Sequence, residues 1–329
     1  MNWWALSPRQ DCIGGKGRRN ARREKQLSGS APAFLATVLV KEDGSPLNDE
    51  DLVSPQLSES QKQDAEHRTS VSAMVVHEAI RRDGDEELQR PASALGWSGL
   101  AAGLSMGFSF VAEGLLRAHL PESQWRPLLV NLGYPLGFLI VIIGRQQLFT
   151  ENTLTAIIPL LARRKLTTLV SVIRLWAIVL AANLVGAHLF ALVIARAPVL
   201  KPEVQQAMAE LATEAANVSF WTALIRGIFA GWLIAMVVWM NAATEAGRFP
   251  IIVTLTYVVG LAGLTHIVAG SVEVLYLVMR GEKSWFSFAA GYMVPALIGN
   301  IIGGVSLVSA VNHAQVVGGI TAKKESRLA

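Results

Sequence analysis

Long apolar segments recur along the C-terminal part of the chain, separated by short polar stretches. A helix needs about 20 apolar residues to cross the roughly 30 Å hydrocarbon core of a bilayer, and six segments are long enough. They lie at about residues 94–116, 129–161, 167–195, 219–240, 250–279 and 286–311. The pattern predicts an all-α integral membrane domain with six transmembrane helices over residues 91–312.

The first 90 residues have a different composition from the rest. They contain 13 Lys and Arg and 15 Asp and Glu, whereas residues 91–329 contain 10 Glu and no Asp. Residues 1–70 are rich in Ser, Gly, Pro and charge, and are predicted to be a disordered cytoplasmic tail. Residues 71–90 carry a weak apolar stripe and are expected to form a short interfacial helix. Residues 313–329 are the predicted cytoplasmic C-terminal tail.

Lys and Arg in short loops set the orientation of a membrane protein, and the richer side faces the cytoplasm. Ten such residues fall on one predicted side: Arg81, Arg82, Arg90, Arg163, Arg164, Lys165, Arg248, Lys323, Lys324 and Arg327. Six fall on the other: Arg117, Arg126, Arg196, Lys201, Arg280 and Lys283. Both termini are therefore expected to be cytoplasmic.

The second and fifth segments do not resemble unbroken helices that face lipid. The second contains the run RQQLFTENT over residues 145–153, and the fifth contains Gly260, Gly263, Thr265, His266 and Gly270. Interrupted helices are tolerated at membrane depth only where protein or a water-filled cavity surrounds the break. Both breaks are therefore expected to lie inside the protein.

The two halves of the membrane domain share motifs in the same order. The first and fourth segments contain GxxAG, at residues 99–103 and 227–231, and the third and sixth contain NxxG, at residues 183–186 and 300–303. Similar spacing to the NxxG motifs pairs Thr150 with His266. Since each half has three segments, the motifs predict an inverted 3+3 repeat with a solute site near the midplane, where the broken helices meet.

The breaks themselves offer a way to attract an anion. A helix N-terminus has unpaired N–H groups and behaves like about half a positive charge. Inverted symmetry would point the N-termini of both second half-helices toward the middle of the membrane. Thr150 and Thr265 are of a type that caps such N-termini. The simpler alternative is that the breaks only permit close helix packing.

His266 is the leading candidate for a functional side chain. An ionisable residue at membrane depth is usually functional, and histidine exchanges a proton near neutral pH. We expect His266 to bind an anion or hand it a proton, unless it only bonds within a helix contact. Arg226 either reaches an interface or lines an outer vestibule that attracts anions. Glu113 is expected to reach water, and Glu273 has no assigned role.

Enzymatic chemistry finds no support in the sequence. There is no GxSxG motif, P-loop or HExxH zinc motif, so we expect neither an enzyme nor an ATP-driven pump. Cys12 is the single cysteine, which excludes an intramolecular disulfide and a cysteine metal cluster. We expect no cofactor and no bound metal. The basic pI is explained by loop charges, so nucleic acid is not an expected partner.

Four groups of residues together resemble the formate/nitrite transporter family. They are Leu148-Phe149-Thr150 in the second segment, GLTHIVA over residues 263–269 in the fifth, RGIFAGWLIAMVVWM over residues 226–240 in the fourth and GNIIGG over residues 299–304 in the sixth. The resemblance covers about residues 72–312. The run HEAIRRDGDEEL before the first segment is similar to a less-studied bacterial branch of the family.

The resemblance implies an aquaporin-like subunit fold and a homopentamer in the bacterial inner membrane, with one pore per subunit. It implies that Thr150 and His266 are the key pore residues, with Leu148 and Phe149 forming part of an apolar constriction. The chain departs from the family pattern at four positions: Gln147 for an acidic residue, Thr265 for Glu, and Gly231 and Gly270 for Asn.

The combined hypothesis is a channel-like carrier of small monovalent anions such as formate or nitrite, in contact with membrane lipids. His266 would hand the anion a proton so that it crosses as a neutral acid. Two alternatives remain: a pore for neutral solutes on the same architecture, or a membrane scaffold that transports nothing and binds a partner through its tail. Liposome flux separates all three.

Overall fold

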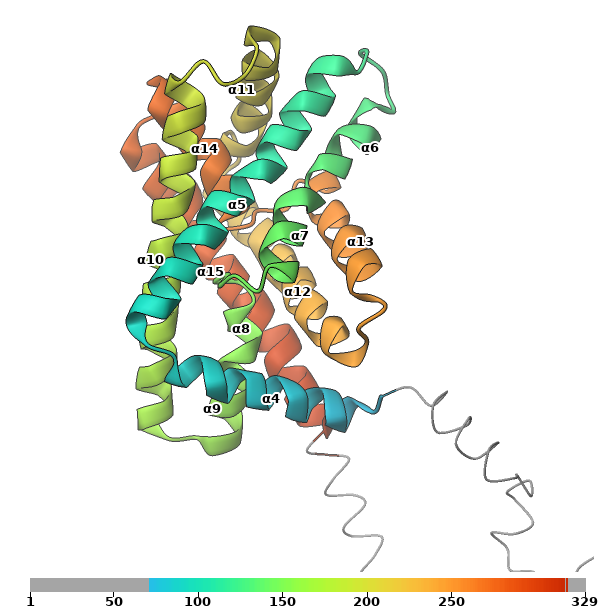
Figure 1. The fold of residues 1–329 in the computed structure, drawn as a ribbon, viewed down its shortest axis with the longest axis vertical. Helices are drawn as coiled ribbons and strands as arrows, with labels where there is room; N and C mark the ends of the chain where they lie inside the picture. The colour runs from blue at the N-terminus through green and yellow to red at the C-terminus, as the bar shows by residue number, and fades with distance from the viewer. Residues whose placement is uncertain (1–70, 317, 319–329) are drawn as a thin grey trace, which may run out of the picture. The chain divides into compact units, whose positions relative to one another are not determined.

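The computed structural model describes residues 71–316 and 318, so the predicted tail at residues 1–70 and most of that at 313–329 lie outside the described residues. Within the described part, all regular secondary structure is helical (Figure 1). The elements are α4 (Ala73–Gln89), α5 (Ala92–His119), α6 (Arg126–Val130), the 3-10 helix η1 (Asn131–Gly133), α7 (Pro135–Ile143), α8 (Asn152–Thr155), α9 (Ile157–Arg163), α10 (Leu166–Arg196), α11 (Pro202–Ala216), α12 (Phe220–Ala243), α13 (Arg248–Leu261), α14 (Ala269–Arg280), α15 (Val294–Ile302), and the π-helices η2 (Ser287–Met293) and η3 (Gly303–Ala310).

Five helices in the described part are long and apolar enough to cross a membrane. They are Ala92–His119, Arg126–Ile143, Leu166–Arg196, Phe220–Ala243 and Ser287–Val316. The fifth segment expected from the sequence is instead divided into α13 and α14, with residues 262–268 between them. In the second expected segment, residues 144–151 separate α7 from α8. Both segments with polar or small residues at their middle are thus interrupted.

The helices before the two breaks end in the same way. Arg145 follows α7 with a φ of 51°, and Gly263 follows α13 with a φ of 59°. The next N–H in each case reaches back five residues, from Gln146 to the carbonyl of Val141 and from Leu264 to that of Val259. This is the Schellman pattern of helix termination. Glycine adopts the left-handed conformation freely, whereas Arg145 does so at a cost of about 1–2 kcal/mol.

The repeated sequence motifs mark contacts between helices. α5 packs against α10, and α12 packs against α15. A Cβ atom on Gly103 would overlap the carbonyl oxygen of Asn183, and one on Gly231 would overlap that of Asn300. A larger residue at either glycine would push the two backbones apart, so small residues in GxxAG are needed for this approach.

Helix α11 was not anticipated from the sequence. It has 15 residues, too few to span a bilayer, and a buried face formed by Val204, Ala207, Met208 and Ala212. This face packs against α5 and α14. Pro202 at its first position and Glu203 in its first turn favour the start of a helix there.

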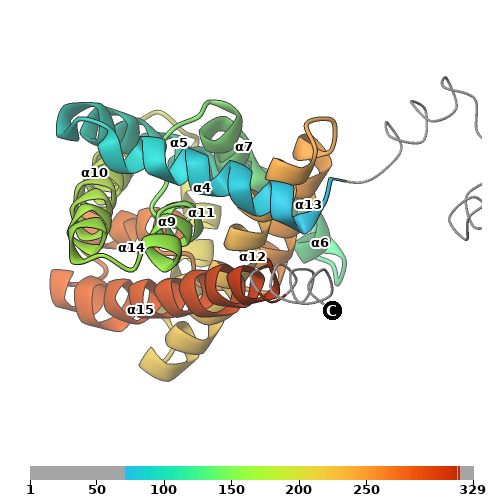
Figure 2. The ribbon, with the colours of Figure 1, turned by 90° about the horizontal axis from the view of Figure 1, so that it is seen from below.

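Helix α4 lies at the end of the bundle opposite α11, within the segment where an interfacial helix was expected (Figure 1). Figure 2, seen from that end, shows α4 running across the other helices. Its buried Val76 and Ile80 form an apolar cluster with Leu154 of α8, Ile158 of α9 and Ala235 of α12. The apolar face of α4 therefore packs on the helices that follow the first break.

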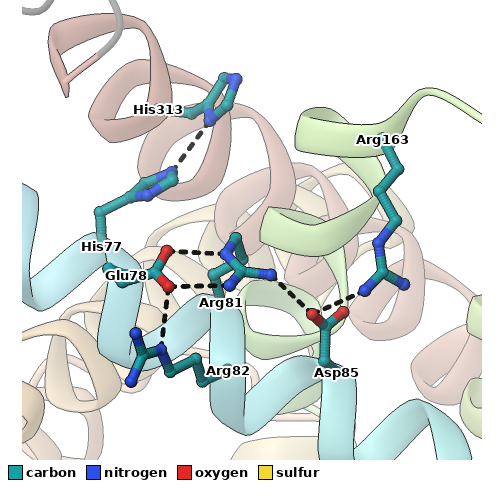
Figure 3. A network of polar contacts seen from close by, with 7 residues as sticks. All are labelled: His77, Glu78, Arg81, Arg82, Asp85, Arg163 and His313. Carbon is teal, nitrogen blue, oxygen red and sulfur yellow. Dashed lines mark hydrogen bonds and ion pairs between the residues drawn. The ribbon is translucent and has the colours of Figure 1, made fainter.

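Polar contacts join α4 to two other elements (Figure 3). Arg81 donates to Glu78 at 2.7 Å and to Asp85 at 2.6 Å, and Asp85 also pairs with Arg163 of α9 at 2.7 Å. His77 Nε2 lies 2.9 Å from Nδ1 of His313, near the end of the last helix. These contacts fix α4 to α9 and to the C-terminal end of the bundle.

The His77 contact predicts a pH dependence. Burial, helped by His313, lowers the pKa of His77 below its ordinary value of 6.5, so the detached state binds more protons than the docked one. Docking of α4 should therefore be strongest above about pH 6.5 and weaken as the pH falls below it. Hydrogen exchange should show less protection of α4 amides at about pH 5.5 than at about pH 7.5, after correction for intrinsic rates.

The matched control is His119→Gln, because His119 is an exposed histidine outside this network. That variant should keep the pH dependence, and His77→Gln should weaken it, because His313, whose pKa is also lowered by burial, remains. Equal protection of wild-type α4 at both pH values would contradict the assignment.

Candidate functional site

Asn183 of α10 holds the first break in place. Its Oδ1 accepts a bond from the N–H of Phe149 at 2.9 Å. Its Nδ2 donates to the carbonyls of Gln147 and Gly99, both at 2.8 Å. The side chain is fully buried. One asparagine therefore satisfies an N–H and a C=O of the broken segment, which would otherwise be orphaned at membrane depth.

Asn300 of α15 does the same for the second break. Its Oδ1 accepts from the N–H of Ile267 at 2.9 Å. Its Nδ2 donates to the carbonyls of Thr265 at 2.8 Å and Gly227 at 2.9 Å. The three bonds of Asn300 thus match the three bonds of Asn183, one for one.

These matched bonds give a different register from the one expected from spacing. Gln147 corresponds to Thr265 and Phe149 to Ile267, so His266 corresponds to Leu148 rather than to Thr150. The spacing argument failed because each loop is positioned by the backbone groups that bond Asn183 or Asn300. Thr150 and His266 do not take part in those bonds.

His266 and Thr150 nevertheless meet. Nε2 of His266 lies 2.8 Å from the hydroxyl oxygen of Thr150, and both side chains are fully buried. The structure therefore joins the two breaks directly through the two residues that the sequence singled out. They face each other across the repeat, although they are not equivalent within it.

The second ring nitrogen fixes the protonation of His266. Nδ1 accepts a bond from the N–H of Ala269 at 3.1 Å, and a backbone N–H can only donate, so Nδ1 carries no proton. The proton of the neutral ring is then on Nε2 and is donated to Thr150. The Thr150 hydroxyl, with one lone pair engaged, keeps its own hydrogen for a further acceptor.

The predicted capping roles of Thr150 and Thr265 are wrong. Helix α14 begins at Ala269, and its first N–H is bound by His266; the Thr265 hydroxyl donates to the Ala223 carbonyl at 2.5 Å. The hydroxyl of Thr150 is engaged by His266. Each threonine hydroxyl therefore bonds a residue of another segment instead of the first turn of the helix that follows it.

The predicted pair of opposed helix dipoles is also unequal. After the first break the chain forms only α8, of 4 residues, and α9, of 7 residues, while α14 after the second break has 12. A macrodipole needs a continuous run of aligned peptides. The dipole contribution therefore comes mainly from the side of His266.

Aromatic and apolar side chains surround the His266–Thr150 contact. The ring of Phe138 meets the imidazole edge-to-face, with centroids 5.0 Å apart. Leu148 and Phe149 are fully buried, and Phe149 packs on Trp176 at 5.6 Å. The polar contact is thus enclosed in a dry environment, where each hydrogen bond is strengthened.

A cavity of about 470 Å³ opens on one side of the breaks. It is lined by residues of α5, α6, α11, α12, α14 and the adjoining loops, and its wall extends to Thr265 and Gly270. His266, Thr150, Leu148 and Phe149 are not part of its wall. We call this cavity the α11-side vestibule; it stops one residue short of His266.

Charged residues of both signs line the α11-side vestibule. Arg226 is among them, which supports the second of its two expected roles. Glu113 also lines it and is only 6% exposed; it was expected to reach water, and its side chain borders the vestibule. Glu273, which had no assigned role, is also one of the charged residues in the vestibule wall.

Two departures from the family pattern have a structural explanation. A Cβ on Gly270 would overlap the hydroxyl of Tyr292, which donates to the His266 carbonyl at 3.2 Å. A Cβ on Gly231 would overlap the backbone of Asn300. Tyr292 thus occupies the space that a larger residue at position 270 would fill, and Gly231 permits the close approach of α15.

Two kinds of site residue were missed in the sequence. Asn183 and Asn300 could have been noticed, since each begins an NxxG motif. We call them the asparagine brackets, because each binds an N–H and a C=O of one break; this role depends on where the loop backbone lies. Tyr292 carried none, because it lies in a π-helical turn far from both breaks in the chain.

Long apolar helices, two internal breaks held by matched asparagines and a vestibule beside them define a membrane channel or transporter. The formate/nitrite transporter model matches residues 74–314, and the chain belongs to the formate/nitrite transporter family. The family comprises transporters and channels rather than enzymes.

Several proteins are similar to this chain over most of its length. The chain is 40% identical to the inner membrane protein YfdC of Escherichia coli over 261 residues, 79% of this chain and 84% of YfdC. It is 26% identical to the formate channel BtFdhC of Bacillus thuringiensis, over 71% of this chain and 91% of that one. The similarity to YfdC confirms the expected branch of the family.

Solved structures share the fold. A pentameric formate channel with formate bound superposes with a TM-score of 0.56 at 20% identity, covering 67% of this chain and 95% of that chain. An FNT family ion channel gives 0.57 at 19% identity, covering 73% and 94%. The common architecture therefore extends over nearly the whole of both channels.

The asparagine brackets predict large and similar effects on stability. Asn300→Leu keeps the size of the side chain but removes three hydrogen bonds, at about 1 kcal/mol each, and leaves buried backbone groups unpaired. We expect a marked fall in melting temperature or a loss of folded protein, and the same for Asn183→Leu. Asn217→Leu, at an exposed asparagine that bonds Lys283, should change little. Wild-type melting of either bracket variant would refute the role.

Proposed function

We propose that this chain is a channel-like transporter of small monovalent anions of the formate and nitrite type. Its fold on this proposal is six transmembrane helices in an aquaporin-like inverted 3+3 repeat with two interrupted helices. The matched bonds of Asn183 and Asn300 support the repeat. So does the direction of the halves, since α5 begins beside α4 and α12 begins after α11, at the opposite end (Figure 1).

The assembly and location follow from the relatives. A homopentamer in the bacterial inner membrane, with one pore per subunit, is proposed from the pentameric formate channel and from YfdC. Loop charges favour cytoplasmic termini, which would put the α11-side vestibule on the outside.

The observation that carries the proposal is the bond between His266 and Thr150. It leaves the Thr150 hydroxyl free to donate to an oxygen of the solute where the two breaks meet. Arg226 would attract the anion into the vestibule without binding it at the centre. His266 acts here as a positioning residue, because a second proton on its ring would destroy the bond from Ala269.

Leu148 and Phe149 would provide the apolar constriction beside this donor. Hydrated cations would be excluded there because these apolar side chains offer no oxygen atoms to replace the water around the cation. A naked anion would also be costly to desolvate, so a solute that can cross as a neutral weak acid is favoured. Nitrite and formate have this property.

A pore for neutral solutes remains the second candidate. The observation in its favour is that Gln147 and Thr265 are uncharged where the family pattern has acidic residues; their backbone carbonyls accept bonds from Asn183 and Asn300. Flux of formate, nitrite, acetate, hydrosulfide and glycerol into proteoliposomes decides between them. Glycerol flux without formate flux would refute the anion proposal, and no flux at all would favour a scaffold.

The Thr150 donor gives the sharpest test by mutation. Thr150→Val keeps the shape of the side chain but removes the hydroxyl, so formate flux should fall by at least about tenfold while the oligomer stays intact. Thr213→Val, at an exposed threonine of α11, is the matched control and should transport normally. Unchanged formate flux in Thr150→Val would move the site elsewhere.

The role of His266 is tested by a pair of variants. His266→Phe removes both the bond to Thr150 and the bond from Ala269, and should abolish flux. His266→Asn keeps polar atoms at the site and should retain partial flux with the wild-type pH profile, because the ring does not titrate in this account. Loss of the pH dependence in His266→Asn would instead assign the proton to His266.

A further inference from the structure

The charges of the α11-side vestibule do not balance. Seven charged side chains line it: Glu113, Arg117, Glu122, Arg126, Glu214, Arg226 and Glu273. Arg117 pairs with Glu214 at 2.9 Å, and also with Glu210 outside the vestibule at 3.2 Å. Arg126 pairs with Glu122. What remains is one cation, Arg226, with two carboxylates.

Neither Glu113 nor Glu273 has a partner within residues 71–316. No hydrogen bond or ion pair joins either side chain to another described residue, although Glu113 is 6% exposed and its carboxyl group is open to the vestibule. The two lie on α5 and α14, which pack against each other. Two carboxylates that share a low-dielectric site do not both ionise readily, and such a pair holds one proton between them. With one proton, the pair and Arg226 sum to zero charge.

Two tyrosines complete the inner wall of this site. The hydroxyl of Tyr134, a residue only 5% exposed, has no hydrogen-bond partner within residues 71–316 and belongs to the vestibule wall. Tyr292 also lines it and bonds the carbonyl of His266. The site therefore has an unpartnered hydroxyl donor in its wall and lies one residue from the closed centre. No charged residue of α10 or α13 contributes to the wall.

We propose that Glu113 and Glu273 form the proton-exchange site of this transporter, so that its substrates are anions of weak acids. The inference rests on the proposed anion transport and assigns its proton to the vestibule. The O–H bond of the protonated carboxyl breaks as an O–H bond forms on the entering anion, leaving a carboxylate behind. The neutral acid then moves past Thr150. A proton from the outer water restores the pair, and the acid releases its proton to water on the far side.

The apolar constriction explains why the proton moves from the carboxyl pair to the anion. An anion beside Arg226 brings the vestibule to one net negative charge, and the transfer leaves that total unchanged. Entry into the apolar constriction favours the neutral acid over the anion. An anion of a strong acid, such as nitrate, accepts no proton and should be excluded.

The test uses the full chain in proteoliposomes, with formate uptake and internal pH recorded together. The double variant Glu113→Gln/Glu273→Gln keeps side-chain size but cannot exchange a proton. Its formate-driven proton uptake should fall by at least about tenfold, with the pH dependence of flux lost. Glu113→Asp/Glu273→Asp should recover part of both. Glu282→Gln, at an exposed carboxylate paired with Arg280, should match the wild type.

A second readout does not depend on transport. Infrared spectra of the wild type should contain the band of a protonated carboxylic acid, which the double Gln variant should lack while keeping its oligomer size. Wild-type proton-coupled flux in that variant, or an unchanged acid band, would overturn the proposal. If the double variant transports nitrate and still couples formate to proton uptake, Glu113 and Glu273 only repel anions. That result would also overturn the proposal. If wild-type protein moves no small anion, both this inference and the proposed function fail.

Discussion

The structure depends on satisfying backbone groups where two helices stop inside an apolar domain. Lipid offers no hydrogen bonds, so each break needs partners from the protein itself. Asn183 and Asn300 supply them, each from a helix that approaches its neighbour over glycine. Without these brackets the loops would have no fixed conformation. The side chains of His266 and Thr150, one from each loop, would then not be held within hydrogen-bond distance.

The scaffold repeats, but the chemistry placed on it does not. By the bracket register His266 stands where the other loop has Leu148, so one half supplies an imidazole and the other an apolar side chain. Thr150, two residues further along, completes the contact from the opposite loop. The single polar contact at the centre therefore needs both breaks. The ring is bonded on both nitrogens, which suits a fixed donor rather than a proton carrier, and the proposed proton exchange is therefore assigned to the vestibule.

Apolar patterning was enough to predict the helical class, the approximate positions of the membrane segments and the two breaks. The GxxAG and NxxG motifs predicted a repeat of two halves, and their glycines lie where α5 meets α10 and α12 meets α15. The pairing of Thr150 with His266 by spacing failed, since register is set by backbone atoms that sequence letters do not show. Helix α11 was missed for a related reason: its burial comes from contacts with α5 and α14, which are far from it in the chain.

The most direct test of this account is a structure of the full-length protein in a lipid nanodisc with formate, determined by electron cryo-microscopy. The account predicts that Asn183 and Asn300 each bind the loop of their own half, with formate density within hydrogen-bond distance of the Thr150 hydroxyl. Breaks that open on the same membrane face, or formate held away from Thr150 with His266 bonded elsewhere, would contradict it.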